Sequence, residues 1–378
     1  MGVQISPWAQ MNNPILFSLK NLKDFFHKYE SALSSTTLVA GFLIDYFTLN
    51  RVDYLFDNIL IIVYLLIAGG SIFLINLYET GRFHNRFTHA AYEFLPFVLQ
   101  FVFGGLFSAF TVFYGKSSSF VATGFFVLTL FVLMVGNEFL KKRYSKLVFQ
   151  LGIYFLALFS FFIYFLPVVL RQMGAIIFLW SGIVSLVFIS AFIFIIARVA
   201  HFQYKESYRT LFLVIFGIWA SMSLLYFLNI IPPIPLSLKA GEIYHSVGKL
   251  AGGGYVATGE KKEKWYQKWS FKKEIHLRAG ESVYVWSSVF APAGLKINII
   301  HAWQYFNEEE GEWIDSSLIS FPVLGGRDGG YRGFSKKENV FPGKWRVDVK
   351  TERGQIIGRI RFDIKTGDFA PELQIRKI

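Results

Sequence analysis

Cysteine is absent from this 378-residue sequence, and charged residues make up only 17% of it. Without cysteine there can be no disulfide, no thiolate nucleophile and no Cys-ligated zinc or iron–sulfur centre. A Ser-His-Asp or Cys-His catalytic arrangement is not recognisable either. The sequence therefore indicates no particular reaction and leaves an enzymatic role open. It gives no reason to expect a cofactor or a metal ion.

Hydrophobic residues, in contrast, form 53% of the chain, and phenylalanine alone occurs 43 times. Since a helix needs roughly 20 apolar residues to cross a hydrocarbon core about 30 Å thick, the long apolar runs predict an α-helical transmembrane bundle. It covers residues 34–231 and has about seven spans. The predicted spans are Ser34–Leu49, Leu55–Tyr78, Ala90–Tyr114, Phe120–Leu140, Leu147–Leu166, Met173–Ala197 and Leu211–Ile231.

Lysine and arginine are unevenly distributed among the predicted loops. Most lie within residues 20–28, 82–86, 141–146 and 198–209, all on one side of the predicted membrane. By the positive-inside rule this side is the cytoplasm. The formal charge of +12 then reflects topology, and we expect the lipid bilayer, not nucleic acid, as a partner.

The N-terminal residues 1–33 lack the short apolar core and cleavage site of a signal peptide. Apolar residues from Ile15 to Tyr29 recur at helical spacing opposite Lys20, Lys23 and Lys28. This pattern predicts an amphipathic helix on the cytoplasmic membrane surface. A helix packed on the bundle is the alternative.

The composition changes after residue 231. Pro232, Pro233 and Pro235 end the last helix, because proline lacks the amide donor, and residues 232–239 form a Pro-rich linker. Residues 240–378 then alternate with period two, as in Ile297–Tyr305. Seven or eight short strands separated by turn-like stretches predict an all-β, immunoglobulin-like sandwich. After an odd number of spans, it lies in the periplasm or outside the cell.

Part of this β region has a recognisable sequence pattern. It comprises His301-Ala302-Trp303, the run Tyr331 to Lys336, the run Pro342 to Val349, and Gly354, Gly358 and Phe362. The pattern resembles the C-terminal module called domain of unknown function 2914, which occurs in bacterial proteins. Several members also carry a multi-span region, which Gly41 to Asp45 and Asn137 to Leu140 resemble. The resemblance implies a fold and a bacterial envelope setting, and no specific activity.

Polar residues near the ends of the first two spans form one candidate site. Asp45, Asp57 and Asn58 lie near Arg51 at the same predicted boundary, and carboxylates are costly inside a bilayer. One hypothesis is a polar site for an ion, a proton or a lipid headgroup. The alternative is a structural salt bridge from Asp45 or Asp57 to Arg51.

A second candidate cluster lies at the predicted cytoplasmic helix ends. It contains His89, Glu93, Asn137 and Glu138, close to several arginines. These residues suit either an anionic lipid headgroup or phosphate, or interhelical ion pairs. Only His89 and Glu93 share a helical face, which is too few ligands for a zinc site.

The β region contributes a third set of candidates, because aromatic faces beside a guanidinium suit sugars and anionic polymers. Arg332 is the leading candidate, since it lies in a Gly-rich stretch. Trp345 alternates with Val347 and Val349 and is predicted to be core, with Arg346 and Asp348 on the opposite face and able to pair. The ligand-binding candidates are Arg332, His301, Trp303, Trp286 and Arg346.

Three functional hypotheses follow. The leading one is an inner-membrane protein whose exported sandwich binds an anionic envelope polymer, a lipid or a protein partner. The alternative is a transporter or membrane enzyme that acts on a lipid-linked substrate at a polar helix-end cluster. The third is a sensor whose sandwich signals through the bundle.

Overall fold

The computed structural model describes residues 40–49, 51–80, 86–117, 120–136, 146–199, 201–251, 254–261, 273–278, 280–366 and 371–378. Within these ranges the side chains of residues 86–91, 93, 120–122, 199 and 201–206 are not described. The predicted amphipathic segment 1–33 lies outside the described residues.

Apolar helices form the first part of the described chain. After a helical segment at residues 40–48 come α2 (Leu55–Glu79), α3 (Arg86–Lys116), α4 (Phe120–Gly136), α5 (Leu147–Leu170), α6 (Ala175–Val199) and α7 (His201–Phe227). Five of these, α2, α3, α5, α6 and α7, contain stretches long and apolar enough to cross a membrane, and α5 is the most deeply buried. The predicted membrane-like helical region is confirmed.

Strands are the regular elements of the described residues after α7. They are β1 (Ser237–Tyr244), β2 (Ser246–Lys249), β3 (Tyr255–Glu260), β4 (Lys273–His276), β5 (Val283–Phe290), β6 (Lys296–Asn307), β7 (Glu312–Leu324), β8 (Tyr331–Lys337), β9 (Gly343–Thr351), β10 (Ile356–Lys365) and β11 (Leu373–Lys377). The strand orders of the sheets are β1-β5-β8, β4-β10-β9-β6-β7 and β11-β3-β2. The prediction of a β-rich C-terminal region is confirmed, but the described residues form eleven strands instead of the seven or eight expected, and β4 pairs with β10 in parallel.

The alternating strand pattern explains the packing of these sheets. Inward residues of β5 from the three-stranded sheet β1-β5-β8 meet those of β6, β9 and β10 from the five-stranded sheet, and Trp303, Trp345 and Phe362 fill the shared core. The opposite face of β5 carries Trp286, which packs with Tyr244 and other residues beneath the small sheet β11-β3-β2. The alternate residues of β6, β9 and β10 project away from the core.

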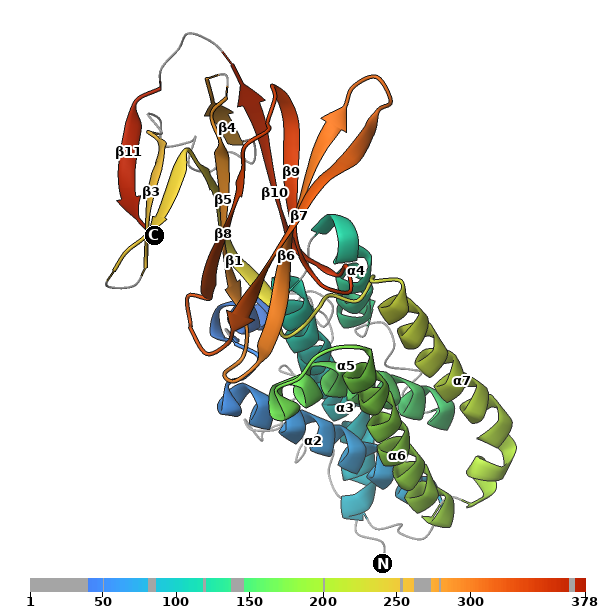
Figure 1. Cartoon of the computed structure of the whole chain (residues 1–378). Helices are drawn as coiled ribbons and strands as arrows, with labels where there is room; N and C mark the ends of the chain where they lie inside the picture. The colour runs from blue at the N-terminus through green and yellow to red at the C-terminus, as the bar shows by residue number, and fades with distance from the viewer. Residues whose placement is uncertain are drawn as a thin grey trace, which may run out of the picture.

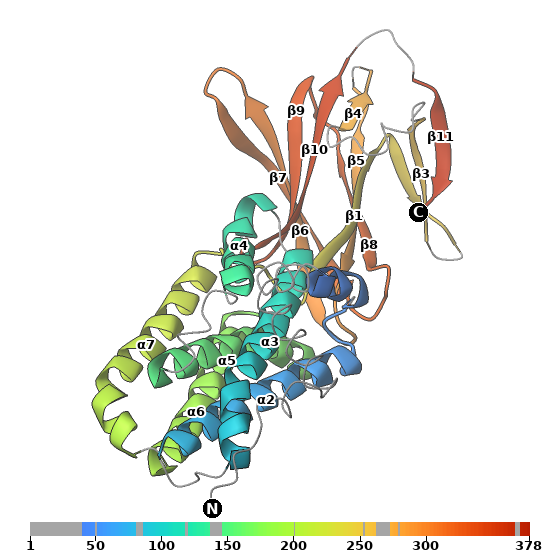
Figure 2. The same cartoon turned by 180° about the vertical axis from the view of Figure 1, so that it is seen from behind.

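The sheets stand at one end of the helices, and their strands run lengthwise away from them (Figures 1 and 2). Residues 231–237 are buried, and β1 begins at Ser237, inside the predicted linker. The Arg353 guanidinium lies 4.4 Å from the ring centre of Tyr226 on α7, while Arg51 pairs with Asp328 after β7. The two parts are therefore joined by direct side-chain contacts.

Candidate functional site

Three of the predicted ligand-binding residues are buried inside the β region. His301 is 0% exposed, with Nε2 2.8 Å from Ser287 Oγ and Nδ1 2.8 Å from Ser335 Oγ. Trp303 donates from Nε1 to the same Ser335 Oγ at 3.0 Å. Burial lowers the pKa of His301 to about 3, so the ring is neutral. These bonds link β6 to β5 and β8, and Trp286 lies in the smaller core.

Arg332 and Arg346, the two predicted arginines, occupy different sheets. Arg332 is exposed on β8, and its carbonyl accepts a hydrogen bond from the Tyr255 hydroxyl at 3.1 Å. Arg346 lies on β9 in the five-stranded sheet. The structure therefore does not bring the predicted ligand-binding residues together as one site.

Arg346 does belong to a continuous polar and aromatic surface, on the side of the five-stranded sheet that faces away from the core. Strand register places Phe306 opposite Trp313 and Arg346 opposite both Gln304 and Arg361. We call this surface the aromatic–arginine face. It consists of Gln304, Phe306, Trp313, Asp315, Lys344, Arg346, Asp348, Arg359 and Arg361.

Two aromatic rings and two cations form the centre of the aromatic–arginine face. The Arg346 guanidinium lies 4.2 Å from the ring centre of Trp313, and Lys344 Nζ lies 5.2 Å from that of Phe306. The two rings are 5.3 Å apart. Such cation–π contacts hold a cation above a ring face at modest cost in desolvation. The arrangement places two partly buried aromatic rings directly beside two positive charges.

A chain of polar contacts fixes Arg346 in place. Its Nε donates to Gln304 Oε1 at 2.5 Å, and Gln304 Nε2 donates to Asp315 Oδ1 at 2.5 Å. Burial, and then the neighbouring charge of Arg359, lowers the pKa of Arg346, with a further contribution from Arg361. Arg346, Arg359 and Arg361 repel one another, and an anionic ligand would relieve this repulsion.

The predicted pairing of Arg346 with Asp348 is wrong. Asp348 instead accepts hydrogen bonds from Arg359 on β10, which lies directly opposite it in the sheet. Cross-strand neighbours on one face are closer than successive outward residues of one strand. Arg346 is therefore left to contact Trp313 and Gln304.

The predicted salt bridge from Arg51 to Asp45 or Asp57 is also wrong. Arg51 donates to both oxygens of Asp53, at 2.9 and 2.6 Å. Asp45 accepts a hydrogen bond from Ser108 on α3 at 2.5 Å. Arg51 faces the β region, where its guanidinium lies 5.1 Å from the ring centre of Phe290.

The remaining candidates that were predicted to lie within the membrane have partly incomplete hydrogen bonding. Asp57 and Asn58 are each 5% exposed, and Asn58 Nδ2 donates to two backbone carbonyls near the start of α2. Asp57 Oδ2 and Asn58 Oδ1 have no hydrogen-bond partner within the described part of the chain. The side chains of His89 and Glu93, and all of Asn137 and Glu138, lie outside the described residues. In the described ranges no three His, Asp or Glu residues are grouped as a metal site.

Sequence reasoning did not include Phe306, Trp313 or Arg361 among the ligand-binding candidates. Phe306 and Trp313 flank the β6–β7 hairpin, and Arg361 alternates with the core residues Ile360 and Phe362. The period-two pattern places Arg361 on the outward face of its strand and could have done the same for Phe306 and Trp313. Only the register shows that these residues lie side by side.

Family comparison identifies the region that carries this face. Residues 296–364 match the family described as "Protein of unknown function (DUF2914)". The match confirms the resemblance predicted from the sequence and runs from the start of β6 to the end of β10. All residues of the aromatic–arginine face lie within the DUF2914 region. A comparison with curated proteins finds no match.

Solved structures show only weak similarity. A β-glucosidase from Listeria innocua in complex with gluconolactone is 14% identical with a TM-score of 0.18; the similarity covers 32% of this chain and 17% of that one. The alkylpurine DNA glycosylase AlkC of Pseudomonas fluorescens, bound to DNA containing an abasic site analog, is 11% identical with a TM-score of 0.22. There the similarity covers 75% of this chain and 83% of that one. At such TM-scores neither similarity indicates a fold or a function.

Proposed function

We propose that this chain is a bacterial inner-membrane protein with seven spans, whose immunoglobulin-like sandwich lies outside the cytoplasm and binds an anionic polymer of the cell envelope. The aromatic–arginine face is the binding surface. The observation that carries this proposal is the stacking of Arg346 on Trp313 beside Phe306 and Lys344. Aromatic planes suit sugar rings, and guanidinium groups suit their carboxylate or phosphate substituents.

Charge favours an acidic polymer over a neutral one. Asp348 is occupied by Arg359, whereas Arg361 is exposed and adds its charge to that of Arg346. Gln304 on β6 lies opposite Asp315 on β7. These two residues supply an amide and a carboxylate that can hydrogen-bond to sugar hydroxyls. Binding through these groups weakens as salt screens the charges.

The test uses the full chain in detergent micelles, with alginate oligosaccharides as the anionic probe and dextran as the neutral control. Alginate should bind and dextran should not, and high salt should weaken alginate binding. Trp313→Ala and Arg361→Ala should each weaken alginate binding by about tenfold. Arg376→Ala, which removes an exposed arginine from β11, is the matched control and should bind normally.

Two results would contradict the proposal. Equal binding of alginate and dextran would remove the role of charge. Loss of alginate binding on Arg332→Ala, with no loss on Trp313→Ala or Arg361→Ala, would move the site to β8, where the sequence first suggested it.

A second candidate function is transport or catalysis within the bundle. It is favoured by Asp57, whose Oδ2 is buried without a hydrogen-bond partner in the described part of the chain. An unpaired intramembrane carboxylate is a common feature of proton and ion pathways. Proton or cation uptake by reconstituted vesicles that is lost in Asp57→Asn would support this function.

A further inference from the structure

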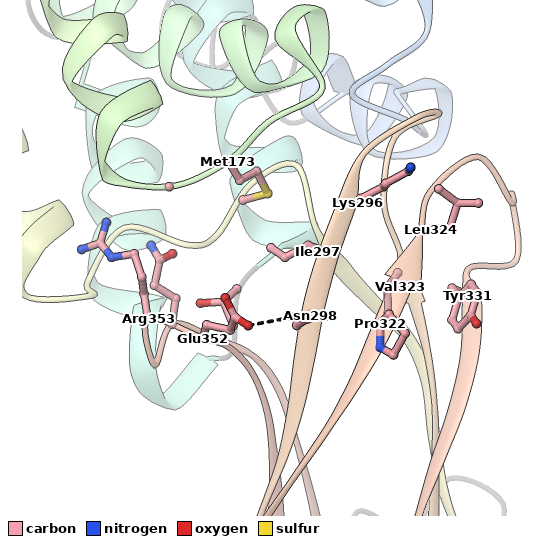
Figure 3. Close-up of a pocket in the computed structure, with 13 residues that line it drawn as sticks. Met173, Lys296, Ile297, Asn298, Pro322, Val323, Leu324, Tyr331, Glu352 and Arg353 are labelled. Atoms are coloured by element: carbon pink, nitrogen blue, oxygen red, sulfur yellow. Dashed lines mark hydrogen bonds between the residues drawn. The ribbon is translucent and has the colours of Figure 1, made fainter.

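Two hollows of similar volume, about 620 and 650 Å³, lie in the described part of the molecule. The first lies where the β region meets the α5–α6 loop, and its lining carries both signs of charge, on Lys296, Glu352 and Arg353 (Figure 3). The Glu352 carboxylate there accepts a hydrogen bond from Asn298 at 2.8 Å. The second hollow lies between α6 and α7 and is almost entirely apolar. This α6–α7 groove restricts its occupant more narrowly.

One face of each helix forms a wall of the α6–α7 groove. The lining residues recur every three or four positions, from Leu186 to Ala197 on α6 and from Tyr208 to Trp219 on α7. Ile189 is 0% exposed, whereas Phe212 is 69% and Phe216 53% exposed. The groove therefore has a closed floor and an apolar side that the described residues leave open.

The groove lies within two helices that are long and apolar enough to cross a membrane. They are also the least buried of the five such helices, at 33% for α6 and 22% for α7. At 1.5 Å per residue, the wall from Leu186 to Ala197 is roughly 16 Å long. This is about half of a hydrocarbon core about 30 Å thick. The length therefore matches an acyl chain from one leaflet of the bilayer.

The inner end of the groove is closed by an aromatic ring. Trp219 on α7 lies against Gly182 on α6, where an added Cβ would be only 2.9 Å from Trp219 Nε1. The absence of a side chain at Gly182 lets the indole pack directly on α6. An occupant can therefore enter from the bilayer side or from the outer end.

Two arginines stand at the outer end, and each is held against an aromatic ring that lines the groove. The Arg198 guanidinium lies 4.5 Å from the ring centre of Phe194. Arg209 donates from Nε to the Tyr208 hydroxyl at 2.9 Å. Both arginines are exposed, and these contacts leave most of the N–H groups of each guanidinium for an anion.

The position of this end suits a lipid headgroup. α6 ends at Val199 and α7 begins at His201, at the end of the helices away from the sheets (Figures 1 and 2). The positive-inside rule predicts that this side is cytoplasmic. Anionic lipids are present in that leaflet, and basic pockets between membrane helices bind their headgroups. An apolar groove with positive charge at its outer end therefore fits an anion that carries an acyl chain.

We propose that the α6–α7 groove binds one anionic phospholipid. An acyl chain lies along Ile193, Phe212 and Phe216, and Arg198 and Arg209 hold the phosphate group at the outer end. The lipid fills the open side of the groove and bridges the two least buried membrane helices. This site is separate from the aromatic–arginine face, and the proposal does not depend on polymer binding.

The test measures lipid retention by the purified full chain in detergent, using native mass spectrometry and thermal unfolding. Phosphatidylglycerol should bind about tenfold more tightly than phosphatidylcholine with the same acyl chains, because the choline group cancels the phosphate charge. Bound phosphatidylglycerol should raise the unfolding temperature. Arg198→Gln and Arg209→Gln should each weaken phosphatidylglycerol binding severalfold. Arg376→Gln on β11 is the matched control and should bind normally.

A second pair of variants tests the groove itself. Ser190 lines the groove, and Ser190→Phe adds a ring that fills it, so retention of phosphatidylglycerol should be lost. Val187 is 62% exposed on the same helix but does not line the groove. Val187→Phe is therefore the matched control and should retain the lipid. All of these variants should bind alginate normally, which separates this site from the proposed function.

Equal binding of phosphatidylglycerol and phosphatidylcholine would overturn the assignment of an anionic headgroup. Normal retention of phosphatidylglycerol by Ser190→Phe would overturn the groove as the site. Equal losses in Ser190→Phe and Val187→Phe would also overturn it, because the lipid would then be held by the general helix surface.

Discussion

Arg359 donates hydrogen bonds from Nε and Nη2 to the two carboxylate oxygens of Asp348, at 2.5 and 2.7 Å. Both side chains are mostly buried, at 11% and 7% exposure. Each oxygen of the Asp348 carboxylate thus accepts a hydrogen bond from Arg359. Arg346, the next outward residue on β9, therefore contacts the Trp313 ring and the Gln304 amide instead of a carboxylate. Its charge is not neutralised by an ion pair within the described residues, and this gives the face its excess of positive charge.

The first prediction concerns this pair. Asp348→Asn keeps the size of the side chain but leaves the Arg359 charge buried without its counter-ion, which should cost about 3 kcal/mol of stability. The unfolding temperature of the full chain in detergent measures the loss. The same variant should bind alginate more tightly at low salt, because one negative charge is removed from the face. Unchanged stability would show that the pair contributes little.

The second prediction separates core tryptophan from surface tryptophan. Trp345 is 1% exposed and donates from Nε1 to the Phe341 carbonyl at 2.9 Å. Trp345→Ala should lower stability by about 3–5 kcal/mol, as large-to-small core substitutions do. Trp313→Ala, on the outward face of the same sheet, is the matched control and should lose binding with much less loss of stability. Chemical unfolding followed by tryptophan fluorescence distinguishes them.

The third prediction is a pH dependence set by His301. Its pKa is about 3 in the folded protein against an ordinary 6.5, so the unfolded chain takes up the proton first. The stabilisation is fully present above pH 6.5 and is lost as the pH falls toward 3, by about 1.4 kcal/mol per pH unit. Unfolding measured between pH 6.5 and 5, above the ordinary carboxyl range, should show this slope. His301→Asn should flatten it, and a slope that persists in this variant would assign the effect to another group.

The fourth prediction concerns Asp45. If its bond to Ser108 is chiefly structural, both Asp45→Asn and Ser108→Ala should lower the unfolding temperature in detergent while a cellular phenotype is largely retained. A stable Asp45→Asn protein that fails to complement a deletion would instead indicate a proton or ion site.

The fifth prediction is the topology. Reporter fusions should place position Lys142 in the cytoplasm and position Lys261 outside it, because the positive-inside rule predicts that the basic loops are cytoplasmic. Fusions at both positions that report the same compartment would contradict this topology.

Helices and core strands could be predicted closely from the sequence. The predicted span Leu55–Tyr78 corresponds to α2 (Leu55–Glu79), and the alternating run 297–305 lies within β6 (Lys296–Asn307). The burial of Trp345 is also as predicted. These features depend on local periodicity, which a single sequence shows. The last helix was expected to reach Ile231 but ends at Phe227, and Asn229 then adopts a left-handed φ of 57°.

The candidate sites were harder to predict because they depend on strand register. The β9–β10 pairing contains an irregularity between Ile356 and Gly358, and the register beyond it decides that Asp348 meets Arg359 and not Arg346. His301 alternates with the core residue Ile299, so its burial was visible in the pattern, yet its residue type suggested a ligand. The α6–α7 groove depends on how two helices pack against each other, and no local pattern indicates it.

The buried linker has a mechanical consequence. Since residues 231–237 are packed and Arg51 and Arg353 hold the sheets to the helices at two further points, little slack chain is available to absorb a pull. A polymer under tension at the aromatic–arginine face would load β6, β9 and β10 along their length (Figure 1), so that their hydrogen bonds resist in shear together. The force would then reach the helices directly, because there is no flexible linker that must first be straightened.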